Sequence, residues 1–328
     1  MNIKQNANFP FSRYTTLMLP EFPDFKNIEI TDKEEIENFT KNYPPYSDFN
    51  FVSLFCWDVD NKRKISMLNG NLVVRSSDDV TGKEFLTFLG TNKVPETVKE
   101  LLKFCRKNKI KQELRMIPEE TIKLINPKEL GVDVKEDRDQ FDYVYSIDSL
   151  SSYPNSEYSR VKKKYNKFLK KYDNNYKVEE FNLGDSICKE QITKLWKEWC
   201  EDKAVFSEEE GVALERLMKN EDSFKLINII VFIGRAPAGF FMGAGVNREY
   251  AVGYFSKTSH IYEGITQALM KEVASVLKKR GYAFFNYEED MGLPGLRQAK
   301  ESFRPVSFLK KYTIIHNGVL QKLFMLYN

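Results

Sequence analysis

The order of the expected helices and strands repeats once along this chain, and that repeat limits the folds it can adopt. The first run is expected as three strands, a helix, a strand, a short helix and a strand, at residues 64–68, 72–75, 84–89, 95–107, 112–117, 118–125 and 141–147. The same order returns at residues 226–233, 239–246, 251–257, 262–280, 282–287, 294–303 and 307–315. We predict an α/β (α+β) fold of two similar domains, residues 1–150 and 151–328.

Within each half, the third strand, the long helix and the next strand predict a βαβ unit, so those two strands run parallel inside a mixed, mostly antiparallel sheet. Open α/β sheets bind ligands beyond the carboxyl ends of their parallel strands. In the second half these ends are Lys257 and the segment 286–290, which is rich in carboxylates. The ends in the first half, residues 89–91 and 117–118, offer almost no titratable side chains. The second half is therefore the catalytic candidate, and the first is expected to be a scaffold.

Lys257, Glu288, Glu289 and Asp290 are expected around one cleft. Adjoining carboxylates near a lysine suit acyl transfer to an amine, because one acid can accept the proton of the incoming ammonium. The alternative is a salt-bridged corner. The following helix bears Arg297, Lys300 and Arg304 on one side, which favours either the binding of phosphate or carboxylate or ordinary solvation.

A second basic surface is expected on a helix whose apolar stripe includes Val161, Phe168 and Tyr172. Its other faces carry Arg160, Lys162, Lys163, Lys164, Lys167, Lys170 and Lys171. This pattern fits contact with a nucleic-acid backbone or an anionic headgroup, and it equally fits a solvated face over a buried aromatic stripe. Asn166 interrupts the lysines and is either a donor to substrate or a surface residue.

Composition excludes several other classes of protein. The net charge is only +3, so no global field attracts nucleic acid or membrane. Four cysteines and two histidines lack the spacing of a disulfide framework or a zinc site, and no metal or bound cofactor is expected. No apolar run approaches the roughly 20 residues of a membrane helix, and Met1–Asn8 lacks a signal-peptide pattern. We expect a cytoplasmic protein.

Several segments of the chain resemble the C-terminal domain of the phosphatidylglycerol lysyltransferase family, including its short relatives of unassigned function. The resemblance is carried by Asp142-Tyr-Val-Tyr145 with Lys162-Lys-Lys-Tyr-Asn-Lys-Phe168, by Tyr254-Phe-Ser-Lys257, and above all by Asn286-Tyr-Glu-Glu-Asp-Met-Gly-Leu-Pro-Gly-Leu-Arg-Gln-Ala-Lys300. Pro44-Pro-Tyr-Ser-Asp48 is a weaker match in the first half. The family has two tandem domains of the GNAT acyltransferase fold and is akin to the peptidoglycan-bridge aminoacyltransferases.

The resemblance implies an acyltransferase that moves an aminoacyl group from aminoacyl-tRNA to a small or lipid-like acceptor. Carried over by position, the candidate catalytic residues are Glu288, Asp290 and Lys257, and the candidate substrate-binding residues are Lys163, Asn166, Asn286, Arg297 and Lys300. The basic helix 160–171 would then contact tRNA, an anionic small molecule or a lipid headgroup.

Two alternatives remain, an acyl-CoA-dependent N-acyltransferase and a non-catalytic protein that binds a ligand or partner. GNAT enzymes that use acetyl-CoA usually have a glycine-rich basic loop before the long helix. Here the corresponding segment Thr258–Gly264 has one glycine and no arginine, which disfavours acetyl-CoA as the donor.

Overall fold

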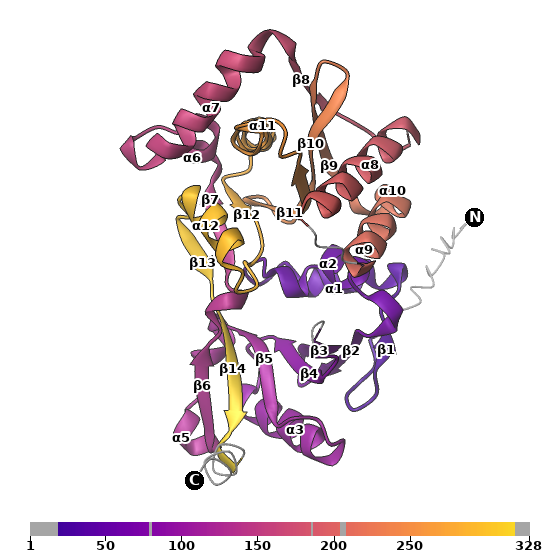
Figure 1. Ribbon diagram of the computed structural model, residues 1–328. Coiled ribbons are helices and arrows are strands. Elements are labelled where there is room, and N and C mark those ends of the chain that lie inside the picture. The colour runs from indigo at the N-terminus through magenta and orange to yellow at the C-terminus, as the bar shows by residue number, and fades with distance from the viewer. Residues whose placement is uncertain (1–18, 79–80, 185, 204–207, 319–328) are drawn as a thin grey trace, which may run out of the picture.

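Figure 1 shows the computed structural model of the chain, in which two sheets lie one above the other with helices around and between them. The structure describes residues 19–78, 81–184, 186–203 and 208–318. Met1–Asn8, on which the expectation of no leader peptide depends, lies outside the described residues.

The first sheet has the strand order β1-β2-β3-β4-β5-β14-β6. Its strands are β1 (Lys26–Asn27), β2 (Lys64–Leu68), β3 (Asn71–Ser77), β4 (Glu84–Leu89), β5 (Glu113–Pro118), β6 (Val132–Glu136) and β14 (Lys311–His316). The β2–β3 hairpin turns at Asn69 and Gly70, both with positive φ, as this dipeptide predicts.

The second sheet has the order β13-β7-β12-β11-β10-β9-β8. Its strands are β7 (Asp142–Ser146), β8 (Tyr176–Glu180), β9 (Ile227–Ile233), β10 (Ala236–Gly245), β11 (Tyr250–Thr258), β12 (Phe284–Asn286) and β13 (Ser307–Leu309). β11 and β12 are parallel, as are β4 and β5. The predicted βαβ unit is therefore present in both halves, and the predicted fold class is confirmed.

Strand exchange between the sheets is the main difference from the expected order. The strand expected to complete the first half, β7, lies in the second sheet between β12 and β13. The strand expected at 307–315 is divided, so that β13 stays in the second sheet while β14 enters the first between β5 and β6. In Figure 1 the yellow chain passes from β13 in the upper sheet to β14 in the lower sheet. The division at residue 150 stays a prediction, but each half lends a strand to the other's sheet.

Helices cover both sheets and fill the space between them. Their bounds are α1 (Lys33–Thr40), α2 (Phe51–Cys56), α3 (Val94–Lys107), α4 (Glu119–Ile122), α5 (Pro127–Leu130), α6 (Ile147–Ser152), α7 (Ser159–Tyr172), α8 (Ser186–Lys203), α9 (Glu208–Lys219), α10 (Glu221–Phe224), α11 (Ile265–Lys279) and α12 (Pro294–Ser302). One buried apolar cluster includes Phe51 of α2, Leu214 of α9 and Phe240 of β10, so it joins the two halves. Across the described ranges, no helix is both long and apolar enough to cross a membrane.

Candidate active site

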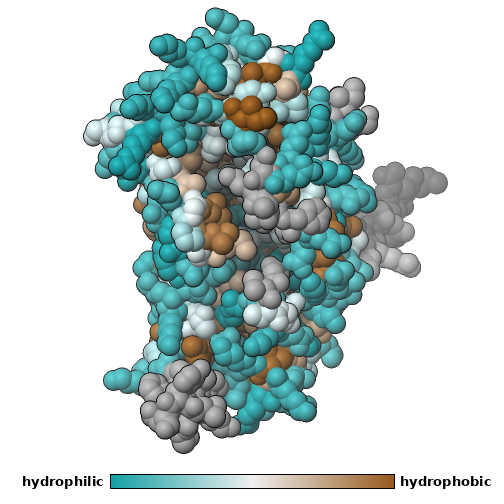
Figure 2. All heavy atoms as spheres, viewed as in Figure 1, coloured by the Kyte–Doolittle hydropathy of each residue, from teal (hydrophilic) through white to brown (hydrophobic). Residues whose placement is uncertain are grey.

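A cavity of about 260 Å³ lies beyond the carboxyl ends of β11 and β12. Lys257 from the end of β11, Glu288 from the loop after β12, and Lys300 from α12 line it, as the sequence predicts for the first two. The rings of Trp57 and Phe255 are nearly parallel, with centroids 5.8 Å apart, and add an apolar wall. Figure 2 shows this side of the molecule as mainly hydrophilic and hollowed near its centre.

Glu288 has the chemistry of a proton acceptor. Burial, and then repulsion by the neighbouring Glu289, raise the pKa of its carboxyl well above the usual value. The Oγ of Ser53 donates to its Oε1 at 3.4 Å, and its own main-chain N–H donates to Oδ1 of Asn286 at 2.8 Å. Its φ of 55° lies in the left-handed region, a conformation that costs energy in a residue with a side chain and often marks a functional site.

The two lysines of this cavity are both held in place. Nζ of Lys300 donates to the carbonyl oxygens of Tyr287 and Glu289, each at 2.5 Å, which pins the loop that carries Glu288. Burial lowers the pKa of Lys300, against the attraction of the two glutamates. Nζ of Lys257 lies 2.8 Å from Oε1 of Glu210 and 3.7 Å from the centre of the Trp199 ring. The cavity therefore combines a protonatable carboxyl with positioned cations.

Asp290 and Arg297 pair with each other instead of facing the cavity. The Arg297 guanidinium binds both carboxylate oxygens of Asp290, at 2.8 and 2.7 Å, and Oη of Tyr143 donates to Asp290 at 2.6 Å. Burial alone would raise the pKa of Asp290, but the bonds from Arg297 and Tyr143 outweigh it and hold the pKa well below the usual range. Arg297 also binds Asp139 at 2.6 Å. These contacts favour the salt-bridged corner for this pair, and a catalytic role of Asp290 stays a prediction.

A buried polar network lies where the two sheets exchange strands. Nζ of Lys311, the first residue of β14, donates to Oδ1 of Asp142 in β7 at 2.7 Å, and it pairs with Asp48. The main-chain N–H of Ser47 and the side chain of Asn286 donate to Oδ2 of Asp142, at 2.8 and 3.1 Å. Asp142 and Lys311 are fully buried. Asn286 is thus an internal anchor for the Glu288 loop, and its predicted role in binding substrate stays a prediction.

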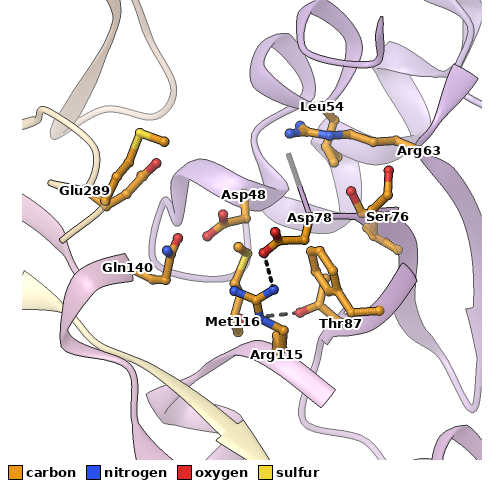
Figure 3. Close-up of a pocket in the computed structure, with 14 residues that line it drawn as sticks. Asp48, Leu54, Arg63, Ser76, Asp78, Thr87, Arg115, Met116, Gln140 and Glu289 are labelled. Atoms are coloured by element: carbon orange, nitrogen blue, oxygen red, sulfur yellow. Dashed lines mark hydrogen bonds and ion pairs between the residues drawn. The ribbon is translucent and has the colours of Figure 1, made fainter. Parts of the chain in front are cut away.

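A second cavity, of about 200 Å³, adjoins the first on the side of the first sheet. Figure 3 shows its charged residues, with Arg63 and Glu289 reaching in from opposite sides and Arg115 paired with Asp78 at 2.6 Å between them. Both cavities are lined by Asp48, Arg63, Glu289 and Met291. The sequence predicts only a scaffold role for the first half, whereas the structure shows that it supplies charged residues to this cavity.

The structure brings Lys257, Glu288 and Lys300 together but leaves Lys163 and Asn166 apart from them. The latter two are exposed on α7 and line neither cavity. Sequence reasoning did not select Ser53 or Arg63. Both come from the first half, and no local pattern connects them with the Glu288 loop. The sequence could have indicated Asp48, because this residue ends one of the segments that carry the family resemblance.

The chain is similar to a known protein family and to several solved structures. The profile of the family "Phosphatidylglycerol lysyltransferase, C-terminal" matches residues 41–315. A conserved protein of unknown function from Bacteroides thetaiotaomicron VPI-5482 has a TM-score of 0.77 at 22% identity, over 90% of this chain and 99% of that one. The C-terminal domain of a putative lysylphosphatidylglycerol synthetase from Agrobacterium fabrum has a TM-score of 0.62 at 10% identity, over 90% and 96% of the two chains.

FemX has a similar fold, with a TM-score of 0.54 at 11% identity over 92% of this chain and 99% of that chain. A search of curated proteins finds no match. These structural likenesses show that the chain shares its overall fold with the three proteins, and the family profile covers most of the sequence. The chain therefore belongs to the family of phosphatidylglycerol lysyltransferase C-terminal domains.

Proposed function

We propose that this protein is an aminoacyltransferase that takes an aminoacyl group from aminoacyl-tRNA and transfers it to a small or lipid-like acceptor with a nucleophilic amine or hydroxyl. The observation that carries the proposal is Glu288, a half-buried carboxyl of raised pKa in a cavity at the end of two parallel strands. A carboxylate whose pKa approaches the working pH is an effective general base.

In the proposed reaction Glu288 accepts a proton from the acceptor as its nitrogen or oxygen attacks the carbonyl carbon of the aminoacyl ester. The bond from that carbon to the ribose oxygen breaks, and the proton passes from Glu288 to the departing oxygen. Lys257 lies at the end of the neighbouring strand β11, where a cation can stabilise the developing oxyanion. Lys300 acts through the loop, because its ammonium fixes the carbonyl groups on both sides of Glu288.

The surroundings of α11 support tRNA as the donor over acyl-CoA. The helix begins after Gly264, and a Cβ added there would lie 2.5 Å from the carbonyl oxygen of Lys164 in α7. The backbone of α7 therefore covers the amino terminus of α11, the end where an anionic pyrophosphate would otherwise be favoured.

The exposed face of α7 offers a surface for nucleic acid. Its seven basic side chains are all exposed, at Arg160, Lys162, Lys163, Lys164, Lys167, Lys170 and Lys171. Among the described residues, only Lys167 of this set forms an ion pair, with Glu263 at 3.0 Å. Neutralising several phosphates with such side chains gives binding that weakens steeply with salt.

The test measures both binding and transfer. Purified protein is titrated with a mixture of charged tRNAs and, separately, with acetyl-CoA. A variant with K163E, K167E and K170E is expected to lose most tRNA affinity at 50 mM salt, whereas the matched variant K99E, K103E and K107E, on exposed positions of α3, is expected to keep it. Tight acetyl-CoA binding without tRNA binding would falsify the proposal. Binding of tRNA with no transfer to any acceptor in a cell extract would instead support the non-catalytic alternative.

A further inference from the structure

Within the part of the chain that the structure describes, the junction of the two cavities combines a guanidinium without an ion pair, that of Arg63, with carboxylates. The four residues that line both cavities are Asp48, Arg63, Glu289 and Met291, so a ligand that occupies either cavity meets these side chains. Figure 3 shows Arg63 and Glu289 extending toward the cavity from opposite sides, with Asp48 between them.

Arg63 has donors to spare. To described residues its side chain makes one hydrogen bond, from Nη1 to the carbonyl oxygen of Ser53 at 3.3 Å. Across the described ranges no carboxylate oxygen lies within ion-pair distance of its guanidinium, in contrast to Arg115, which pairs with Asp78. A guanidinium presents five N–H donors in a fixed plane that matches a carboxylate or phosphate. A half-buried guanidinium without an ion pair, at the wall of a cavity, is suited to an anionic group of a ligand.

The opposite side of the junction has an excess of negative charge. Asp48, Asp142 and Glu289 all surround the buried ammonium of Lys311, whose Nζ lies 4.0 Å from Oε2 of Glu289. Glu289 also attracts the buried Lys300, so these three carboxylates face two cations. Burial raises the pKa of Asp48 to about 6, with the attraction of Lys311 opposing the shift and the two other carboxylates adding to it. An additional cation beside Asp48 and Glu289 would relieve this repulsion.

We propose that the junction binds an amine that also carries an anionic group, with Arg63 holding the anion and Asp48 and Glu289 holding the ammonium. Such a ligand is an amino acid, a short peptide with both ends free, or an amino phosphate. Glu289 lines the same cavity as Glu288, so the bound amine lies beside the proton acceptor.

This inference rests on the proposed function in one respect, that the bound amine is the acceptor of the aminoacyl group. In that step the bound ammonium first loses one proton to solvent, which frees its lone pair. A C–N bond then forms between the amine and the aminoacyl carbon, the ester C–O bond breaks, and a second amine proton reaches the ribose oxygen through Glu288. Binding itself requires neither tRNA nor transfer.

The experiment measures binding to the full chain by calorimetry without tRNA. The carboxylate probes are L-alanine, L-lysine and glycylglycine, and the phosphate probe is O-phosphoethanolamine. Alaninamide and ethanolamine lack the anion, while propionate and inorganic phosphate lack the amine. We expect at least one probe with both charges to bind more than 10-fold tighter than its counterparts with one charge, and the probe that binds identifies carboxylate or phosphate as the anion.

Three variants and one matched control assign the two charges. R63Q is expected to weaken the binding of that probe by about 10- to 100-fold, because a hydrogen bond to a charged group is lost. R63K is expected to restore part of the affinity. R106Q, at an exposed position on α3, is the matched control and is expected to bind like wild type. E289Q is expected to weaken the binding of the probe with both charges but not the binding of propionate or inorganic phosphate.

Thermal unfolding shows whether each variant is folded. Equal binding of all probes, no binding of any, or an unchanged affinity in folded R63Q would overturn the inference. Because these titrations contain no tRNA, their failure is distinct from a failure of aminoacyl transfer, and transfer to an acceptor without an anionic group would refute the inference alone.

Discussion

The two sheets place the same kinds of strand in the same positions, yet they differ in the side chains at the ends of their parallel pairs. In the first sheet β4 and β5 end near Gly90 and Pro118, whereas in the second β11 and β12 end near Lys257 and Glu288. Each pair is followed in its sheet by an antiparallel strand that comes from the other half, β14 or β7. The comparison teaches that the fold supplies the position of a site, while the residues on a few loops decide whether it has any chemistry.

The largest expected effect of a mutation is at the buried link between the two halves. Lys311 and Asp142 are fully buried and join the two exchanged strands. We expect K311M to lower the free energy of unfolding by about 3–5 kcal/mol, because it leaves buried carboxylates without their cation. Urea denaturation measures this loss. In the double variant with D142N the loss should be smaller than the sum of the two single losses, and simple additivity would contradict the coupling.

Glutamates that follow the parallel strands of the two sheets test where the chemistry lies. Glu288 comes after β12, and Glu119 comes directly after β5, where it pairs with Lys123 at 3.2 Å on the surface. We expect E288Q to reduce aminoacyl transfer by about 10²- to 10⁴-fold, because the proton acceptor is lost. E119Q is expected to transfer at the wild-type rate. Equal rates in both variants would remove Glu288 from the mechanism.

The pH dependence of stability is expected to distinguish Asp48 at the junction from ordinary surface acids. The pKa of Asp48 in the folded protein is about 6, above its usual value of 3.8, so between these pH values the folded state keeps a proton that the unfolded chain releases. Stability contributed by Asp48 is therefore greatest at low pH and falls as pH rises from about 4 to 6.

We expect the difference in unfolding free energy between wild type and D48N to change by about 2–3 kcal/mol across this range, in the direction of a less stable wild type at pH 6. Denaturant unfolding at a series of pH values measures it. A difference that stays constant with pH, or one of the opposite sign, would show that the pKa of Asp48 is not raised.

Alanine variants at two glycines with the same φ test how closely α7 packs against the start of α11. Gly264 and Gly281 both have φ of 88°, but only at Gly264 would a Cβ meet other atoms, among them the carbonyl oxygen of Lys164. Both alanine variants should lose about 1–2 kcal/mol through the left-handed conformation, and G264A should lose about 1–3 kcal/mol more through overpacking. Thermal unfolding of the two variants gives the comparison. Equal losses would mean that α7 moves away freely.

Local patterns predicted most elements, and the reasons are physical. A short, nearly continuous apolar run gave β4 its bounds, and the charges after β12 indicated the cavity with Lys257 and Glu288. The pattern of 311–316 gives no information on which sheet accepts it, because strand pairing depends on distant partners. β6 was missed because Val132–Glu136 has only two apolar residues. The site residues Ser53 and Arg63 reach the cavity by tertiary packing, which spacing along the chain does not encode.

The exchanged strand β14 also bears on how the chain is made. A ribosome releases residues in order, and domains generally fold from the amino end as they emerge. Here β6 pairs only with β14 in its sheet, and β14 covers the edge of β5. The first sheet to be synthesised is therefore among the last parts to close, and until residues 311–316 emerge β5 offers an open edge to other chains or to a chaperone.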